Sequence, residues 1–313
     1  MRFARFGSFA ALFIAAAGCQ TDDGGGVTAV IPPLAFVRYV NAVPDSISLD
    51  SLTITQRTAP LVGADTVFRT TTFTTIVRWV DQLEFTPFTF ANVAFKGVGQ
   101  GLYQGLEAGS RHFRIFTYDT KLAVLTGPFG TTTTQLADTT VNFVAGQYYT
   151  IVYIRPTSGT GQHVRVYTDS LPAANAAAVQ YRTMNLAPSL GAVDVYATAL
   201  ANTAISGTPD AVGVAELGRS PYRTRAAVAF AAQVTATAQL TSLAGTAAPT
   251  GVAGTTGTSG ADAIAGATIG GSVLTAMAFR ASPAVIFHGR TIRAAIVPSV
   301  VWVADRQPLR INP

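Results

Sequence analysis

The chain has 313 residues, of which 49% are hydrophobic and 12% are charged, about half the ~25% of charged residues that is usual in soluble proteins. This composition excludes an intrinsically disordered chain, which needs low hydrophobicity and many charges, and it excludes a coiled coil. A single Cys excludes an intramolecular disulfide and every zinc or iron–sulfur site built on cysteines.

The first 18 residues have the pattern of an export signal. Arg2 and Arg5 provide positive charge, and an apolar run follows from Phe9 to Ala17. A membrane-spanning helix needs about 20 apolar residues, so this shorter run predicts a cleaved signal and not an anchor helix. Without the two arginines the formal net charge falls from +5 to +3, and no run of Lys and Arg remains. We therefore expect no nucleic-acid binding.

The signal ends in Ala16-Ala17-Gly18-Cys19, which resembles the lipobox of bacterial lipoproteins, although Ala15 stands where that motif usually has Leu. The resemblance implies cleavage before Cys19 and lipidation of its thiol and new amine. An ordinary secretory signal with a chance cysteine is the alternative.

Residues 19–33 are predicted to form a flexible tether, because the segment after Cys19 is short, polar and Gly-rich. Two or more acyl chains would hold such a chain stably on a bilayer. Gln20, in place of the Asp that retains enterobacterial lipoproteins at the inner membrane, implies the outer membrane, and the periplasmic or surface orientation stays open.

The remaining chain contains an internal repeat. The pattern Arg-x-x-Asn-x-x-Pro-x₅-Asp occurs from Arg38 to Asp50 and again from Arg182 to Asp194. Later landmarks recur in the same order, namely Tyr103 and Tyr222, Thr150 and Thr275, and Asp169 and Asp305. This order predicts two homologous domains, copy one (34–175, with an insertion at about 57–90) and copy two (176–313, with a flexible, low-complexity loop at about 245–260).

Strand patterns predominate in both copies, so the predicted fold class is all-β, with two tandem immunoglobulin-like β-sandwiches. Residues 163–168 alternate between apolar and polar, and residues 148–154 are apolar on both faces, which is typical of a central strand. Strands are also expected at 113–118, 179–183, 193–197 and 300–303. The Ala-rich segment 226–238 is interpreted as strand because the repeat places it opposite 109–118.

The opening segment Val37 to Asp45, its echo at 181–188, the strand Val193-Asp194-Val195-Tyr196 and the segment 145–150 resemble domain of unknown function 4397. That family recurs in tandem on exported bacterial proteins. The resemblance implies an extracytoplasmic β-sandwich and no assigned activity.

The repeated Arg, Asn and Asp residues form the main candidate constellation. Asn41 and Asn185 are expected to cap turns with their side chains, and Arg38 and Arg182 are expected to pair with Asp50 and Asp194. We interpret this role as structural, with ligand binding as the alternative. His112, His163 and His288 are interpreted as strand or turn histidines, so neither a metal site nor a cofactor is predicted. No G-x-S-x-G motif or nucleotide loop is present, and calcium binding by a loop is left open.

The sequence therefore favours a non-enzymatic envelope lipoprotein that serves adhesion, scaffolding or a structural role at the cell surface. Its only assigned site is lipidation at Cys19, and its partners are the membrane and envelope proteins or glycans. The alternative is a carbohydrate- or peptide-binding module that supplies an envelope enzyme or transporter, through the aromatic residues Trp79, Phe85, Phe88 and Phe90. The oligomeric state is left open.

Overall fold

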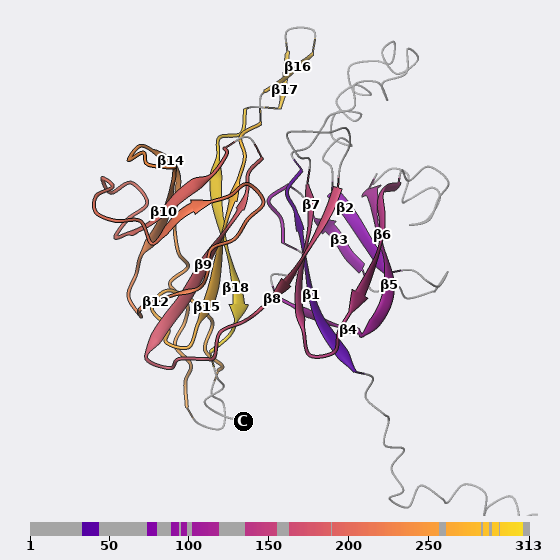
Figure 1. Cartoon of the computed structure of the whole chain (residues 1–313), viewed down its shortest axis with the longest axis horizontal. Helices are drawn as coiled ribbons and strands as arrows, with labels where there is room; N and C mark the ends of the chain where they lie inside the picture. The colour runs from indigo at the N-terminus through magenta and orange to yellow at the C-terminus, as the bar shows by residue number, and fades with distance from the viewer. Residues whose placement is uncertain are drawn as a thin grey trace, which may run out of the picture. The chain divides into compact units, whose positions relative to one another are not determined.

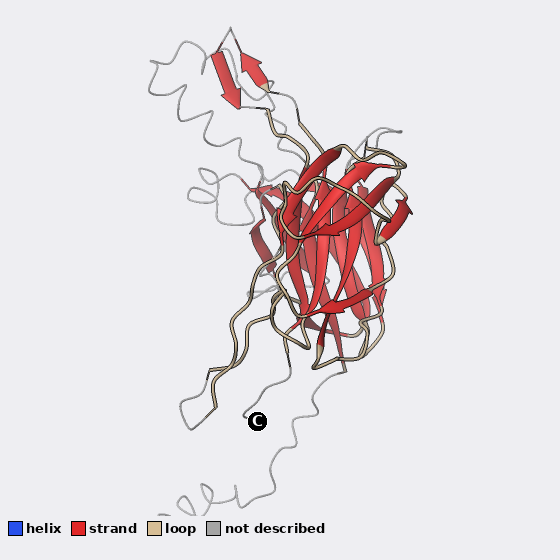
Figure 2. Ribbon diagram, turned by 90° about the vertical axis from the view of Figure 1, so that its left-hand side faces the viewer, coloured by secondary structure: helices blue, strands red, loops and turns tan. Residues whose placement is uncertain are grey.

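The computed structural model describes residues 33–43, 74–79, 89–93, 95–98, 102–118, 135–154, 163–188, 190–256, 261–282, 284–287, 290–293 and 295–308. Every regular element in these ranges is a β-strand, as predicted for an all-β fold (Figure 2). The same residues accordingly contain no helix that is long and apolar enough to span a membrane. Residues 1–18 and Cys19, and the tether up to residue 32, lie outside the described residues.

Copy one contributes eight described strands to two four-stranded sheets, sheet A with the order β4-β1-β7-β8 and sheet B with the order β3-β2-β5-β6 (Figure 1). The strands are β1 (Leu34–Asn41), β2 (Thr74–Trp79), β3 (Thr89–Val93), β4 (Gln104–Glu107), β5 (Gly109–Tyr118), β6 (Gln135–Phe143), β7 (Tyr148–Ile154) and β8 (His163–Asp169).

Copy two repeats this arrangement, with sheet C in the order β12-β9-β15-β18 and sheet D in the order β11-β10-β13-β14. Its hairpin β16–β17 forms a separate two-stranded sheet beyond the ends of the larger sheets (Figure 1). The strands are β9 (Ala178–Leu186), β10 (Val193–Thr198), β11 (Ala211–Val214), β12 (Arg223–Ala226), β13 (Ala231–Ala236), β14 (Ser242–Ala247), β15 (Val273–Phe279), β16 (Val285–Phe287), β17 (Arg290–Arg293) and β18 (Ser299–Arg306).

Each copy contains one parallel pair of strands inside an otherwise antiparallel sheet. Strand β1 runs parallel to β7, and β9 runs parallel to β15. The turn before each second partner contains a glycine at positive φ, Gly146 (74°) before β7 and Gly271 (85°) before β15. Glycine adopts this backbone conformation without the steric cost that a Cβ would bring. The repeat seen in the sequence is therefore a repeat of topology.

Apolar clusters show that the sheets are stacked in the order B, A, C, D. Tyr149 and Ile151 on one face of β7 pack with Val141 and Phe143 of sheet B. Val152 and Ile154 belong to a second cluster together with Met184, Leu186, Met277 and Phe279 of sheet C. The other face of sheet C packs on sheet D, for example through Ala276 and Val195.

Sheets A and C are thus covered on both faces, which explains why their central strands are almost entirely buried. All seven residues of β15 are buried, and six of the seven residues of β7 are buried. Each large apolar side chain that is fully removed from water contributes about 1.5–3 kcal/mol to folding. The predicted pair of tandem sandwiches is joined through a shared core, and Leu34–Pro313 forms one compact unit.

Two predicted segments differ in the structure. Strands β2 and β3 occupy the places of β10 and β11, so they are not an insertion. Between Asn41 and β2 lie 74 − 41 − 1 = 32 residues, and between Asn185 and β10 lie 193 − 185 − 1 = 7, so the 25 additional residues precede β2. In the segment 245–260, predicted as a loop, residues 245–247 belong to β14, and Val252 forms a bridge with Ile264.

Candidate functional site

The most polar cluster in the described residues lies buried between sheets A and C. Arg38 is inaccessible to solvent, and its Nη1 donates to Oδ1 of Asp305 at 2.6 Å. Its Nε and Nη2 donate to Oγ1 of Thr150 at 3.2 and 3.0 Å, and Nη2 also donates to the hydroxyl of Tyr103 at 3.0 Å. An arginine of copy one is therefore paired with an aspartate of copy two, 267 residues away.

Arg182 makes the reciprocal contacts from copy two. Its Nη2 donates to Oδ1 of Asp169 at 2.7 Å, and its Nε donates to Oγ1 of Thr275 at 3.0 Å. Arg219 adds a second cation to the same carboxylate, with Nη1 at 2.9 Å from Oδ1 of Asp169. Each copy thus offers its arginine to the carboxylate of the other.

Each aspartate is also held by a threonine and a tyrosine of its own copy. Thr150 and Tyr103 donate to Oδ2 of Asp169, the tyrosine at 2.8 Å. Thr275 and Tyr222 donate to Oδ2 of Asp305, the tyrosine at 2.7 Å. The guanidinium carbons lie 4.4 Å (Arg38 over Tyr103) and 4.8 Å (Arg182 over Tyr222) from the ring centroids. We call these eight residues and Arg219 the arginine–aspartate network.

The charges of the network keep one another ionised. Burial acts to lower the pKa of Arg38, but Tyr103 and the carboxylates of Asp305 and Asp169 outweigh it, so that this pKa lies above its usual value. Burial acts to raise the pKa of Asp169, but the guanidiniums of Arg182 and Arg38 outweigh it and lower this pKa. Burial raises the pKa of both Tyr103 and Tyr222, which keeps their hydroxyl groups protonated as donors.

The two carboxylates of the network bond to other groups of the protein. Both carboxylates are inaccessible to solvent, and both oxygens of each accept hydrogen bonds from within the protein. A catalytic acid, base or nucleophile must reach a substrate, and these groups cannot do so while sheets A and C are stacked. Removing one partner of such a buried pair typically costs about 3–5 kcal/mol, because the remaining charge stays buried without compensation.

The prediction that Arg182 pairs with Asp194 is wrong. Its carboxylate accepts hydrogen bonds from the backbone N–H groups of Gly213 at 2.7 Å and Ala238 at 2.8 Å, and its strand β10 lies in sheet D. The side chains of a strand alternate between the two faces of its sheet, and Arg182 lies on the face of sheet C that is turned toward sheet A and away from sheet D. Asp50 lies outside the described residues.

The predicted role of the two asparagines is confirmed. Oδ1 of Asn41 accepts from the backbone N–H of Val43 at 3.0 Å, and Oδ1 of Asn185 accepts from that of Ala187 at 3.2 Å. Asn185 also donates from Nδ2 to the carbonyls of Gly191 and Val214. An asparagine that bonds to the backbone two residues later forms an Asx turn, so both copies leave this strand by the same device.

The other candidate residues are not brought together. His112 lies in β5 and His163 begins β8, in different sheets, and His288 is outside the described residues. No group of three or more His, Cys, Asp or Glu side chains suited to a metal occurs among the described residues. Trp79 ends β2 and Phe90 lies in the adjacent β3, whereas Phe85 and Phe88 lie outside the described ranges.

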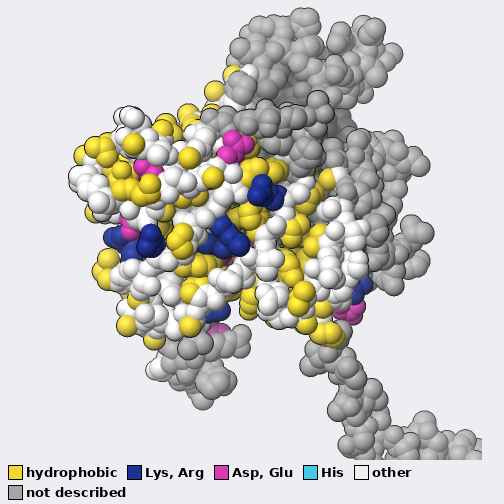
Figure 3. Space-filling model, in the orientation of Figure 1, with side chains coloured by type: hydrophobic (Ala, Val, Ile, Leu, Met, Phe, Trp, Pro, Cys, Tyr) yellow, Lys and Arg dark blue, Asp and Glu magenta, His cyan; other side chains and the backbone are white. Residues whose placement is uncertain are grey.

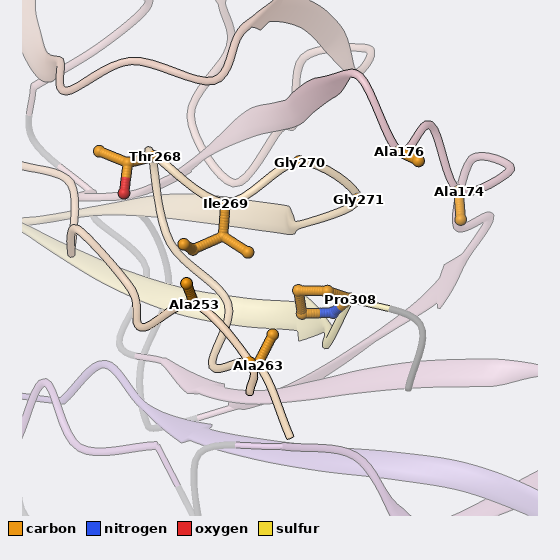
Figure 4. Close-up of a pocket in the computed structure, with 10 residues that line it drawn as sticks. Ala174, Ala176, Ala253, Ala263, Thr268, Ile269, Gly270, Gly271 and Pro308 are labelled. Atoms are coloured by element: carbon orange, nitrogen blue, oxygen red, sulfur yellow. The ribbon is translucent and has the colours of Figure 1, made fainter. Parts of the chain in front are cut away.

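A small pocket of about 390 Å³ lies at the linker between the copies (Figure 4). Ala174 and Ala176 of the linker face Ile269 and Pro308 across it, and Thr268 is its one lining residue with a polar side chain. It therefore offers an apolar wall and no charged group.

A family model matches the first part of the chain. The domain of unknown function DUF4397 matches residues 35–196, which span copy one and the first two strands of copy two. No curated protein matches the chain closely enough to count as a relative. Since the match covers more than half of the 313 residues, the chain belongs to the DUF4397 family.

Proposed function

We propose that this protein is a non-enzymatic lipoprotein of the cell envelope, in which two β-sandwich copies form one stiff module for adhesion, scaffolding or structural display. The observation that carries the proposal is the arginine–aspartate network. This buried polar cluster joins the two halves of the chain, and its two carboxylates are inaccessible to solvent.

The surface and the sequence lend further support. On the face drawn in Figure 3, Lys and Arg lie in small separate groups among apolar and uncharged polar side chains. Such a surface suits contact with other envelope components better than the capture of a polyanion, which needs a continuous basic patch. Cys19 at the end of an apolar signal run supports a lipid anchor, and the Gly-rich segment after it supports a tether.

The test of the anchor is the intact mass and detergent partition of the protein expressed in a bacterial host, beside the variant Cys19→Ala. We expect a mass increased by acyl chains and recovery in the detergent phase for the wild type, and loss of both in the variant. An unmodified wild-type protein that stays in the aqueous phase would overturn the anchor and leave a secreted β-protein.

The test of the orientation uses whole cells that carry the wild type. Residues 173–177 of the linker are exposed and offer a site for proteolysis, so cleavage by added protease reports a surface orientation.

Binding to a glycan array that disappears in Trp79→Ala would contradict a purely structural role and favour the binding module instead.

A further inference from the structure

The face that joins the copies is built from equivalent residues on both sides. Arg38, Thr150 and Asp169 of copy one correspond to Arg182, Thr275 and Asp305 of copy two in the network. The apolar part follows the same offsets, because Val40, Val152 and Ile154 meet their own counterparts Met184, Met277 and Phe279 in one cluster. The two faces therefore have the same polar end and the same apolar end.

We propose that this face of copy one is a self-association surface, so that it binds a second copy of itself when copy two is removed. The contact inside the chain then corresponds to a twofold dimer whose subunits have been joined by a linker. In such an isologous interface the same patch serves on both subunits, and each contact occurs twice. The reciprocal contacts of Arg38 with Asp305 and of Arg182 with Asp169 have this form.

Charge complementarity supports the proposed partner. Copy one offers one buried cation, Arg38, and one buried anion, Asp169, to the face. If a second copy one took the place of copy two, each Arg38 would meet the Asp169 of the other subunit, and both ion pairs would be restored. Thr150 and Tyr103 would still hold each carboxylate, since they belong to the same copy as Asp169.

The apolar end is less full in copy one than in copy two. Copy one has smaller side chains at Val40, Ala42, Val152 and Ile154, where copy two has Met184, Leu186, Met277 and Phe279, and a larger one at Tyr167, where copy two has Val303. Unfilled volume in an apolar core lowers stability, so we expect the dimer of copy one to be weaker than the internal pairing. In the intact chain the linker gives copy two a high effective concentration at the face of copy one, so the internal pairing prevails.

The experiment starts from the full chain, with a protease site inserted between Ala174 and Asn175, both exposed. The folded protein is cleaved, the halves are separated in urea, and the copy-one half is returned to buffer and weighed by native mass spectrometry. We expect a folded dimer of the copy-one half. A copy-one half that remains monomeric overturns the proposal.

Two charge-swapped variants test whether this face forms the dimer. The first combines Arg38→Asp with Asp305→Arg, and the second combines Asp169→Lys with Arg182→Glu. Both keep opposite charges between positions 38 and 305 and between positions 169 and 182, and the second also places the new lysine beside Arg219. The first variant leaves copy one with two anions at the face, and the second leaves it with two cations. We expect each variant copy-one half alone to dimerise at least tenfold more weakly than the wild type.

Mixing the two variant halves provides the control for folding. The anionic face of one half complements the cationic face of the other, so an equimolar mixture should form a heterodimer although neither half pairs with itself. Undiminished self-pairing of the variant halves, or a mixture that stays monomeric, would show that the dimer uses another surface and would overturn the proposal.

Discussion

The two aspartates of the network have equivalent threonine and tyrosine partners and are both inaccessible to solvent, but the cations that pair with them differ in exposure. Asp305 faces Arg38, which is inaccessible to solvent, whereas Asp169 faces both Arg182 and Arg219, and the Arg219 side chain is 35% exposed. One side of the network is sealed, and the other reaches the surface through one cation. We therefore expect the two sides of the network to contribute different amounts to stability.

The largest effect is expected for Arg38→Gln. This substitution leaves the Asp305 carboxylate buried without its main cation, so we expect the free energy of unfolding to fall by about 3–5 kcal/mol. Urea denaturation followed by circular dichroism measures the change.

Arg219→Gln is the matched control on the open side. Asp169 keeps Arg182, and the lost cation was partly in water, so we expect a loss of about 1 kcal/mol or less. Equal losses for the two variants would contradict the distinction between a sealed and an open side.

Alkaline pH should weaken the contact between the copies through the buried tyrosines at that face. Burial raises the pKa of Tyr167 to about 12, and it raises the pKa of Tyr103 and Tyr222 further. The stability that these tyrosines contribute is fully present below pH ~10. It falls as the pH rises, because the unfolded chain releases protons that the folded chain retains. For Tyr167 the loss is about 1.4 kcal/mol per pH unit between pH ~10 and ~12.

Urea titrations at several pH values from 8 to 11 measure this slope. Tyr222→Phe should make it shallower by about one proton, because phenylalanine does not ionise. A slope that is the same in the variant and the wild type would mean that Tyr222 is not protected in the folded state.

Asn185→Ala tests how much an uncharged buried side chain contributes to stability. The substitution removes the donor to the carbonyls of Gly191 and Val214 and the acceptor for the Ala187 N–H, so we expect a loss of about 1–3 kcal/mol. Asn175→Ala removes a similar contact from an exposed residue and should cost a few tenths of a kcal/mol. Similar midpoints for both variants in thermal unfolding would contradict this explanation.

Tyr167→Phe tests a contact that copy two cannot repeat. The Tyr167 hydroxyl donates to the carbonyl of Leu217 at 2.8 Å, and the equivalent position in copy two is Val303. We expect a loss of about 1 kcal/mol with an unchanged denaturant slope. An unchanged midpoint would show that the hydrogen bond is replaced by water.

Much of the fold was predictable from local pattern. The strand expected at 148–154 coincides with β7, and the Ala-rich segment assigned to strand contains β13, because alternation and β-branched residues report burial directly. The landmarks of the repeat also contain the residues of the network, since Arg38, Tyr103, Thr150 and Asp169 recur as a set. Their recurrence was the available signal for a shared site.

The partners within that set were not predictable. A period of two shows that the side chains of a strand alternate between its faces, but it does not show which sheet covers a face. Arg38 and Asp305 are separated by 267 residues, and their contact depends on the stacking of sheet A on sheet C. The match of Asp50 with Asp194 followed chain order, whereas the additional residues before β2 shift the true equivalence.

The central position of β1 has a mechanical consequence. Leu34 begins β1, so a pull through the preceding chain enters the strand at this residue and acts along its axis. Strand β1 is bonded to β4 on one side and β7 on the other, so the load is shared by both ladders in shear and is not concentrated on one rung at a time. Arg38 on the same strand transmits part of the load to Asp305. Traction on one end of the chain is therefore borne by both copies together.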